Sequence, residues 1–327
     1  MSRKRYEPFH EPPPIFVMEP HSFCNLTCLS CLTGQRRLQR PAGKMSYPSL
    51  KRLVDEVSPW LKAVHWSGMC EPLFHEDSLG YLTCLSDAGI RVRVDTNGHF
   101  FRNRDFVDRL VKTRPSEINI AVDGTDQASL AAVRGPNADF QLLIAGIQLL
   151  VEARDRLRSK LKINLQFIIS RPNEHLTGEF LALGRSLRPD SMTFKAIRLD
   201  PSDKRACRTL MPRSARYRGY KKGPNGVWQL KGEMLRQCWA IRSYCMIWWD
   251  GTLLPCCFDL TGKYAFGNVF TTSFKEAWSS DTAVRFRQLA SSDLRSIPMC
   301  KICPVGRNEI NCWEIDLNEK ESQNGRP

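Results

Sequence analysis

The sequence of 327 residues has no apolar run that approaches the roughly 18 residues needed to cross a membrane. The basic start, Met1 to Tyr6, is not followed by the apolar segment of a signal peptide. Internal repeats and low-complexity tracts are also lacking, which excludes repeat architectures. We therefore expect a globular, cytoplasmic protein with no membrane partner.

Cysteine, by contrast, is abundant, with thirteen residues. Without an export signal, this number favours metal binding over a disulfide scaffold. Three cysteines lie within residues 24–31 and seven within 238–312, while Cys70, Cys84 and Cys207 are scattered. Two separate groups indicate two metal sites.

The first group, Cys24, Cys28 and Cys31, has the spacing C-x3-C-x2-C after a short apolar run. Three thiolates on one loop can bind three irons of a four-iron cluster and leave the fourth iron open. A zinc site is the alternative, because zinc usually takes four ligands and His21 could be the fourth.

Predicted strands and helices alternate six times between Ile15 and Ala196. This alternation indicates a parallel sheet covered by helices, and the number of units favours a full or partial (β/α) barrel. The predicted strands are 15–18, 63–66, 90–94, 118–122, 163–169 and 192–196. The predicted helices are 46–57, 79–88, 104–112, 140–157 and 174–187.

Unusual residues follow these strands, at the ends where barrels carry their chemistry. Gly68 lets the backbone approach a ligand closely, and the carboxylate of Glu71 can accept from an ammonium group. The guanidinium of Arg134 suits a carboxylate. Further segments at strand ends are Asn97-Gly98, Asp123-Gly124 and Ser170.

The segment from Ile197 to Arg236 loses this periodicity and contains eleven basic but only three acidic residues. The net charge of the whole chain is +14, so this segment carries much of the excess. It is either a solvated linker or a basic lid over an acidic substrate. A hairpin then follows over 245–254, with Asp250-Gly251 as its turn, and short helices are predicted at 274–278 and 282–289.

These motifs resemble the radical S-adenosylmethionine (SAM) superfamily, whose fold is a partial (β/α)6 barrel. The resemblance implies a [4Fe–4S] cluster on Cys24, Cys28 and Cys31, with exchangeable SAM on its open iron. It also implies a set of SAM-binding positions: Gly68, Glu71, Pro72, Asn97, Asp123, Arg134 and Ser170. The sequence departs from the family at Ser30, at Met69-Cys70 and at Ala121, where a serine is usual.

The tail resembles the SPASM/twitch extension of that superfamily, which binds auxiliary clusters. The resemblance implies one auxiliary [4Fe–4S] cluster, held by Cys238, Cys256, Cys300 and Cys303. Cys257 is the rival of Cys256, and a zinc ribbon on the same cysteines is the alternative. Cys245 and Cys312 remain as speculative hydrogen-atom donors.

We therefore predict four parts: a lead-in over 1–14, a partial barrel over 15–196, a basic linker over 197–235 and an auxiliary-cluster domain over 236–327. The expected activity is abstraction of a hydrogen atom from an unactivated C–H bond. A net oxidation of a small metabolite, such as a sugar or aminocyclitol, or of a peptide is favoured. A flavodoxin- or ferredoxin-type protein is expected as electron donor.

Two alternatives stay open. One is a radical SAM epimerase that uses a cysteine as hydrogen donor. The other is a non-enzymatic zinc or iron–sulfur protein that transfers electrons or binds nucleic acid. The basic charge permits a nucleic-acid partner, but such a protein would have no use for Glu71 and Arg134, so nucleic acid is not expected.

Overall fold

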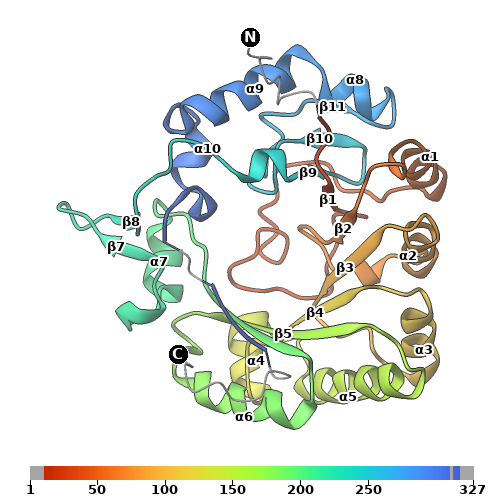
Figure 1. The fold of residues 1–327 in the computed structure, drawn as a ribbon. Helices are drawn as coiled ribbons and strands as arrows, with labels where there is room; N and C mark the ends of the chain where they lie inside the picture. Colours follow the sequence, from red (N-terminus) through yellow and green to blue (C-terminus); the bar gives the residue numbers. More distant parts are fainter. Residues whose placement is uncertain (1–10, 310–311, 317–327) are drawn as a thin grey trace, which may run out of the picture.

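The computed structural model describes residues 11–309 and 312–316, so most of the predicted lead-in lies outside the described residues. Ten of the described strands form one curved sheet in the order β11-β10-β9-β1-β2-β3-β4-β5-β6-β12 (Figure 1). The central six are parallel and follow the chain order: β1 (Ile15–Met18), β2 (Ala63–Trp66), β3 (Arg91–Thr96), β4 (Glu117–Ala121), β5 (Lys162–Ile169) and β6 (Ser191–Ala196).

The C-terminal part extends this sheet at both edges. β9 pairs with β1 in parallel, with Ile15 opposite Tyr244, and β10 and β11 continue the sheet antiparallel. At the other edge, β12 pairs with β6 antiparallel, with Cys312 opposite Lys195. These strands are β9 (Tyr244–Ile247), β10 (Thr252–Leu254), β11 (Gly267–Asn268) and β12 (Cys312–Asp316).

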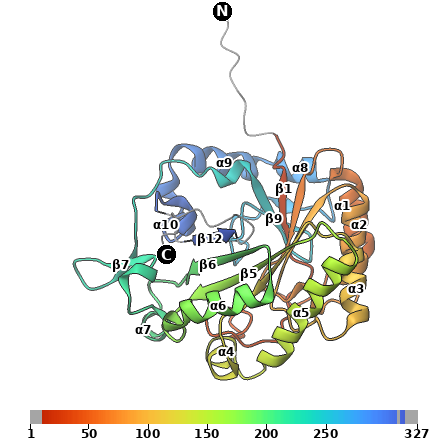
Figure 2. The ribbon, with the colours of Figure 1, turned by 60° about the horizontal axis from the view of Figure 1, so that its bottom comes forward.

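Helices cover the outer face of the sheet, as Figures 1 and 2 show. Those of the barrel are α1 (Tyr47–Val57), α2 (Ser78–Asp87), α3 (Arg104–Lys112), α4 (Gln127–Arg134), α5 (Phe140–Arg156) and α6 (Thr177–Leu187). Those that follow are α7 (Lys204–Leu210), α8 (Phe274–Trp278), α9 (Asp281–Ser292) and α10 (Pro298–Lys301). None of the helices in the described part of the chain is long and apolar enough to span a membrane.

Several helices begin at polar caps that the sequence shows. Ser46 accepts from the backbone N–H of Ser49 at the start of α1, as predicted. Asn103 and Asp139 cap α3 and α5 in the same way. These caps satisfy backbone N–H groups that have no partner inside the helix, so they fix where each helix begins.

Aromatic side chains on the outer face of the strands pack against these helices. Trp66 of β2 makes an edge contact with Tyr81 of α2, with ring centroids 5.7 Å apart. On the far side of the barrel, Phe167 of β5 lies 4.6 Å from Phe180 of α6. Because side chains alternate along a strand, the neighbours of Trp66 and Phe167 face the inside of the curved sheet.

The inside of the sheet is polar rather than filled with branched aliphatic residues. Arg93, Asp95, Asn119, Asn164 and Gln166 alternate there with apolar residues that are buried on the helix side. A closed barrel usually fills its interior with Val, Ile and Leu. The polar side chains therefore indicate that this interior is a functional site and not a packed core.

The predicted partial barrel is confirmed. The prediction of the helices missed α4, which is rich in alanine and short. Within 197–235 the structure has elements of its own: α7 and a hairpin of β7 (Tyr220–Lys222) and β8 (Trp228–Leu230). Both views show this hairpin at the edge of the molecule beside α7.

Candidate functional site

The cysteine loop, residues 24–40, follows β1 and is fixed to the end of α4. The backbone N–H groups of Thr27 and Leu29 donate to the carbonyls of Arg134 and Val133, at 3.3 and 3.1 Å. Gly135 makes this contact possible, because an added Cβ would lie 2.0 Å from Thr27 Oγ1 and its φ is +90°. The loop and α4 therefore form one unit.

The three thiols of this loop lie close enough to interact electrostatically. Asn97 Nδ2 lies 3.9 Å from Cys24 Sγ, and Arg134 Nη1 lies 3.6 Å from Cys28 Sγ. Burial raises the pKa of Cys24 to about 12, and burial also raises the pKa of Cys28 although Arg134 opposes this. A metal must therefore displace protons from these thiols when it binds.

Arg134 is held beside Cys28 by Asp123. Its Nη2 lies 2.6 Å from Asp123 Oδ2, and the other carboxylate oxygen of Asp123 accepts from the backbone N–H of Ile168 at 2.7 Å. Burial lowers the pKa of Arg134, but Asp123 and Cys28 raise it more, so the guanidinium stays charged. Its Nε is buried without a hydrogen-bond partner among the described residues.

Glu71 is buried, and its carboxylate accepts from three groups of the protein. These are Thr96 Oγ1 at 2.6 Å, the backbone N–H of Asn97 at 2.7 Å and that of Leu73 at 3.2 Å. Burial raises the pKa of Glu71 to about 7. Glu71 thus holds the end of β3, and with it Asn97, in place beside Cys24.

Ser170 and Pro72 are buried at the same ends of the sheet. The backbone N–H and hydroxyl of Ser170 both donate to Asn173 Oδ1, at 2.7 and 3.0 Å. Asn173 in turn donates to the carbonyl of Asp123 at 2.9 Å. Sequence reasoning missed Asn173, which ties the ends of β4 and β5 together.

A buried ion pair beneath the cysteine loop was also missed. Glu19, which follows β1, lies 2.5 Å from Arg40 Nη2 and accepts from the backbone N–H of Met69 at 2.7 Å. Gly68 makes room for this carboxylate, since an added Cβ would lie 2.6 Å from Glu19 Oε2. The signal available in the sequence was a carboxylate placed directly after a buried strand.

The predicted auxiliary cysteines, Cys238, Cys256, Cys300 and Cys303, come together from three separate segments. Cys256 interacts electrostatically with Cys300 and Cys303, and both of these interact with Cys238. Burial raises the pKa of Cys300 to about 12 and that of Cys303 to about 11. These four thiols are the donor set that a [4Fe–4S] cluster requires.

Cys257 has a different neighbour. Burial raises the pKa of its thiol, and Arg198, which follows β6, lowers it. Arg198 also interacts with Cys303 and lies over the ring of Phe258 at 4.4 Å. Arg198 thus lies near both Cys257 and Cys303, and Cys257 also interacts with Cys256, so both Cys256 and Cys257 stay candidates for the fourth ligand.

No three His, Cys, Asp or Glu side chains among residues 11–309 and 312–316 converge tightly enough to hold a single metal ion. In a cluster each thiolate binds its own iron, so the sulfur atoms need not converge on one point. The number and type of donors in both groups fit four-iron clusters.

Serine variants distinguish the two neighbouring cysteines. We expect Cys256→Ser to remove about four irons per chain, because one of four cluster ligands is lost. Cys257→Ser is the matched control and is expected to keep the full iron content. Iron is measured after anaerobic reconstitution, and the reverse pattern would make Cys257 the ligand.

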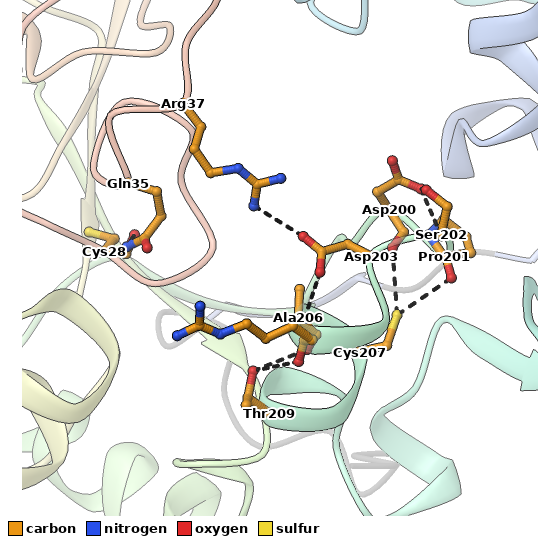
Figure 3. Close-up of polar contacts among 11 residues, drawn as sticks. Cys28, Gln35, Arg37, Asp200, Pro201, Ser202, Asp203, Ala206, Cys207 and Thr209 are labelled. Carbon is orange, nitrogen blue, oxygen red and sulfur yellow. Dashed lines mark hydrogen bonds and ion pairs between the residues drawn. The ribbon is translucent and has the colours of Figure 1, made fainter.

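The basic segment contacts the cysteine loop. Figure 3 shows Arg37 pointing across to Asp203, with Nη1 and Oδ2 3.0 Å apart. Asp203 also caps α7 by accepting from the backbone N–H of Ala206 at 2.9 Å. The Cys207 thiol donates to the carbonyl of Asp200 at 3.5 Å, so it is a buried structural group. This segment is therefore attached to the barrel and is not a free linker.

Family models match both cysteine groups. The model of the radical SAM superfamily matches residues 18–165, and that of the SPASM iron–sulfur cluster-binding domain matches residues 238–304. The first range contains the cysteine loop, Glu71 and Arg134, and the second begins at Cys238 and includes the other three auxiliary cysteines.

Curated relatives agree with these models. The chain is 28% identical to an AdoMet-dependent heme synthase of Methanosarcina barkeri over 141 residues, which is 43% of this chain and 40% of that protein. It is 23% identical to the tungsten-containing aldehyde ferredoxin oxidoreductase cofactor-modifying protein of Pyrococcus furiosus, over 90% of both. It is 24% identical to the mycofactocin maturase MftC of Mycobacterium ulcerans, over 81% of this chain and 74% of that protein.

Solved structures share the fold. BtrN in complex with AdoMet and 2-DOIA has a TM-score of 0.57 at 15% identity, over 90% of this chain and 93% of BtrN. Streptococcus suis SuiB bound to its precursor peptide SuiA has a TM-score of 0.62 at 15% identity, over 89% of this chain and 71% of SuiB.

Proposed function

Since the chain belongs to the radical SAM superfamily and carries a C-terminal SPASM domain, we propose that it oxidises an unactivated C–H bond of a small polar molecule or a peptide. When bound, a [4Fe–4S] cluster and SAM supply the radical that removes the hydrogen atom. Such enzymes need a reductant, for which we propose an electron donor of the flavodoxin or ferredoxin type.

The residues of this chain would have the following roles in binding the cluster and SAM. Cys24, Cys28 and Cys31 would hold the first cluster. Asp123 orients Arg134, whose positive charge suits the carboxylate of SAM. Glu71 positions Asn97 beside Cys24 and would shape the SAM site. Gly68, Pro72 and Ser170 would shape the same site.

The observation that carries the proposal is the position of the two cysteine groups at opposite walls of one polar interior. On β3, Asp95 faces inward two residues before Asn97, which contacts Cys24. On β6, Lys195 faces inward three residues before Arg198, which interacts with Cys303. A net oxidation removes a hydrogen atom and then a proton and an electron. A cluster on the auxiliary cysteines would accept that electron.

Relatives support a modifying role. MftC is a maturase, the Pyrococcus furiosus protein modifies a cofactor, and BtrN and SuiB were solved with 2-DOIA and with a precursor peptide. Small molecules and peptides are thus both represented among proteins of this fold. The polar interior of the barrel favours a substrate, whether a small molecule or a peptide, that carries a polar group near the C–H bond that reacts.

Electron paramagnetic resonance and product analysis test the proposal together. We expect two cluster signals in the reduced enzyme, of which SAM shifts one, and formation of 5′-deoxyadenosine. A Cys300→Ser/Cys303→Ser variant is expected to lose the unshifted signal and keep SAM cleavage. Absence of 5′-deoxyadenosine from the wild-type enzyme, with both clusters assembled, would overturn the proposal.

An epimerase is the second candidate, and Cys312 favours it. Cys312 pairs with Lys195 across β12 and β6, so both side chains point to the same face of the sheet. Cys245 is different: it is fully buried on the helix side of β9, beside Arg287 of α9. Solvent deuterium in the product, lost in Cys312→Ser, would identify the epimerase.

A further inference from the structure

Three polar side chains occupy equivalent places on three strands of the barrel. His65, Asp95 and Lys195 are each the penultimate residue of their strand, in β2, β3 and β6. Each alternates with residues buried on the helix side, so each faces the interior near the end that carries the cysteine loop. We call these three residues the polar rim.

The members of the polar rim are near one another although β2 and β6 are not neighbours in the sheet. His65 interacts electrostatically with both Asp95 and Lys195. Lys195 interacts with Arg93 and Arg198, which lower its pKa, and with Asp95 and Cys312, which raise it. The polar rim therefore spans the interior from one wall to the other.

A layer of amides on β4 and β5 differs from the polar rim, because its members bond to one another. Asn164 donates to Asn119 Oδ1 at 2.5 Å, and Asn119 donates to Gln166 Oε1 at 3.2 Å. All three are at most 9% exposed. The amide layer is structural, whereas His65, Asp95 and Lys195 are each partly exposed.

Within residues 11–309, the positive charge of Lys195 is not neutralised by an ion pair with a carboxylate, whereas Asp95 is paired with Arg93. The carboxylate of Asp95 accepts from Arg93 Nε at 3.0 Å and from Asn119 at 2.9 Å, and Arg93 also lies 3.6 Å from Glu117. Among residues 11–309, no carboxylate lies within 4.0 Å of the Lys195 ammonium. Burial and the nearby Arg93 lower the pKa of Lys195, and an anion beside it would reverse this effect.

We propose that Lys195, with His65 and Arg93 beside it, binds an anionic group of the substrate, either a carboxylate or a phosphate. Asp95 orients Arg93, and its own negative charge weakens the attraction of the site for an anion. Because the polar rim lies between the two cysteine groups, this contact would hold the substrate in the interior. This inference rests on the proposed function, and it narrows the substrate to an anion or a zwitterion.

Calorimetric titration of the anaerobically reconstituted enzyme with SAM tests this inference. Succinate and inorganic phosphate serve as probes of the two chemistries. We expect one of them to bind the wild-type enzyme and to bind Lys195→Gln at least ~10-fold more weakly, as the loss of a charge-assisted hydrogen bond implies. Lys160→Gln, which removes an exposed charge outside the barrel, is the matched control and is expected to bind as the wild type does.

Asp95→Asn is expected to change the affinity for the probe in the opposite direction to Lys195→Gln. General disruption of the fold would weaken binding and cannot produce this result. Removal of this carboxylate is expected to tighten binding of the same probe. Equal affinity of the wild type and Lys195→Gln, weaker binding by Asp95→Asn, or binding of neither probe would overturn the inference. Formation of 5′-deoxyadenosine without substrate, measured on the same samples, tests the proposed function separately.

Discussion

Replacing Cys24, Cys28 and Cys31 together by alanine is expected to abolish 5′-deoxyadenosine formation and to remove about four irons per chain. The physical reason is that these three thiols share one loop and supply all three of the protein ligands assigned to this cluster. His21 is committed elsewhere: its Nε2 bonds to the carbonyl of Glu71 at 2.9 Å, and the backbone N–H of Phe23 donates to its Nδ1 at 3.0 Å. Iron content and 5′-deoxyadenosine are measured on the same anaerobic preparation.

The control for this variant removes cysteines that lie outside both groups. A Cys84→Ala/Cys207→Ala variant loses two buried thiols but is expected to retain all of the iron and SAM cleavage. If the triple variant kept its iron, or the control lost it, the assignment of the first cluster to the cysteine loop would be wrong. Zinc in place of iron in the wild-type protein would contradict it equally.

Removing Arg40 is expected to lower the free energy of unfolding by about 3–5 kcal/mol, because it leaves the buried carboxylate of Glu19 without its partner. The Arg40 side chain is only 4% exposed and also lies 4.1 Å from the ring of Trp248. Arg40→Met keeps much of the volume, so the loss reports mainly on the charge. Denaturant unfolding of the reconstituted enzyme measures it.

Two further variants show whether the pair itself is responsible. Lys44→Ala breaks the exposed pair with Glu76 and is expected to change the free energy of unfolding far less than Arg40→Met does, because water screens this pair. The double variant Glu19→Gln/Arg40→Met is expected to be more stable than Arg40→Met alone, because no unpaired charge then remains buried. Equal stability of the single and double variants would mean that Arg40 acts through packing.

The sequence was a good guide where local signals decide the structure. Apolar strands separated by amphipathic helices identified β1 to β6, and Ser46 marked the start of α1. The Asp250-Gly251 pair also predicted the hairpin turn. In the structure, Gly251 has a φ of +88°, a conformation that favours glycine. Each of these features depends on residues close together in the chain.

Features that depend on distant residues were not predicted. The parallel pairing of β9 with β1 joins residues that are more than two hundred positions apart, and no periodicity reports such a partner. The pair of Glu19 with Arg40 and the polar rim were missed for the same reason. Their members appear in the sequence as isolated polar residues, and only the curvature of the sheet brings them together.

The strands that pair with the two outer strands of the barrel, β1 and β6, come from the C-terminal part of the chain. This order has a consequence for folding during biosynthesis. Until residues 244–247 and 312–316 have left the ribosome, β1 and β6 both present unpaired backbone groups. A nascent or truncated chain that stops before Tyr244 therefore exposes two strand edges that can pair with other chains. We expect expression of the barrel segment alone to yield aggregates, with the C-terminal segment acting as an intramolecular chaperone for both edges.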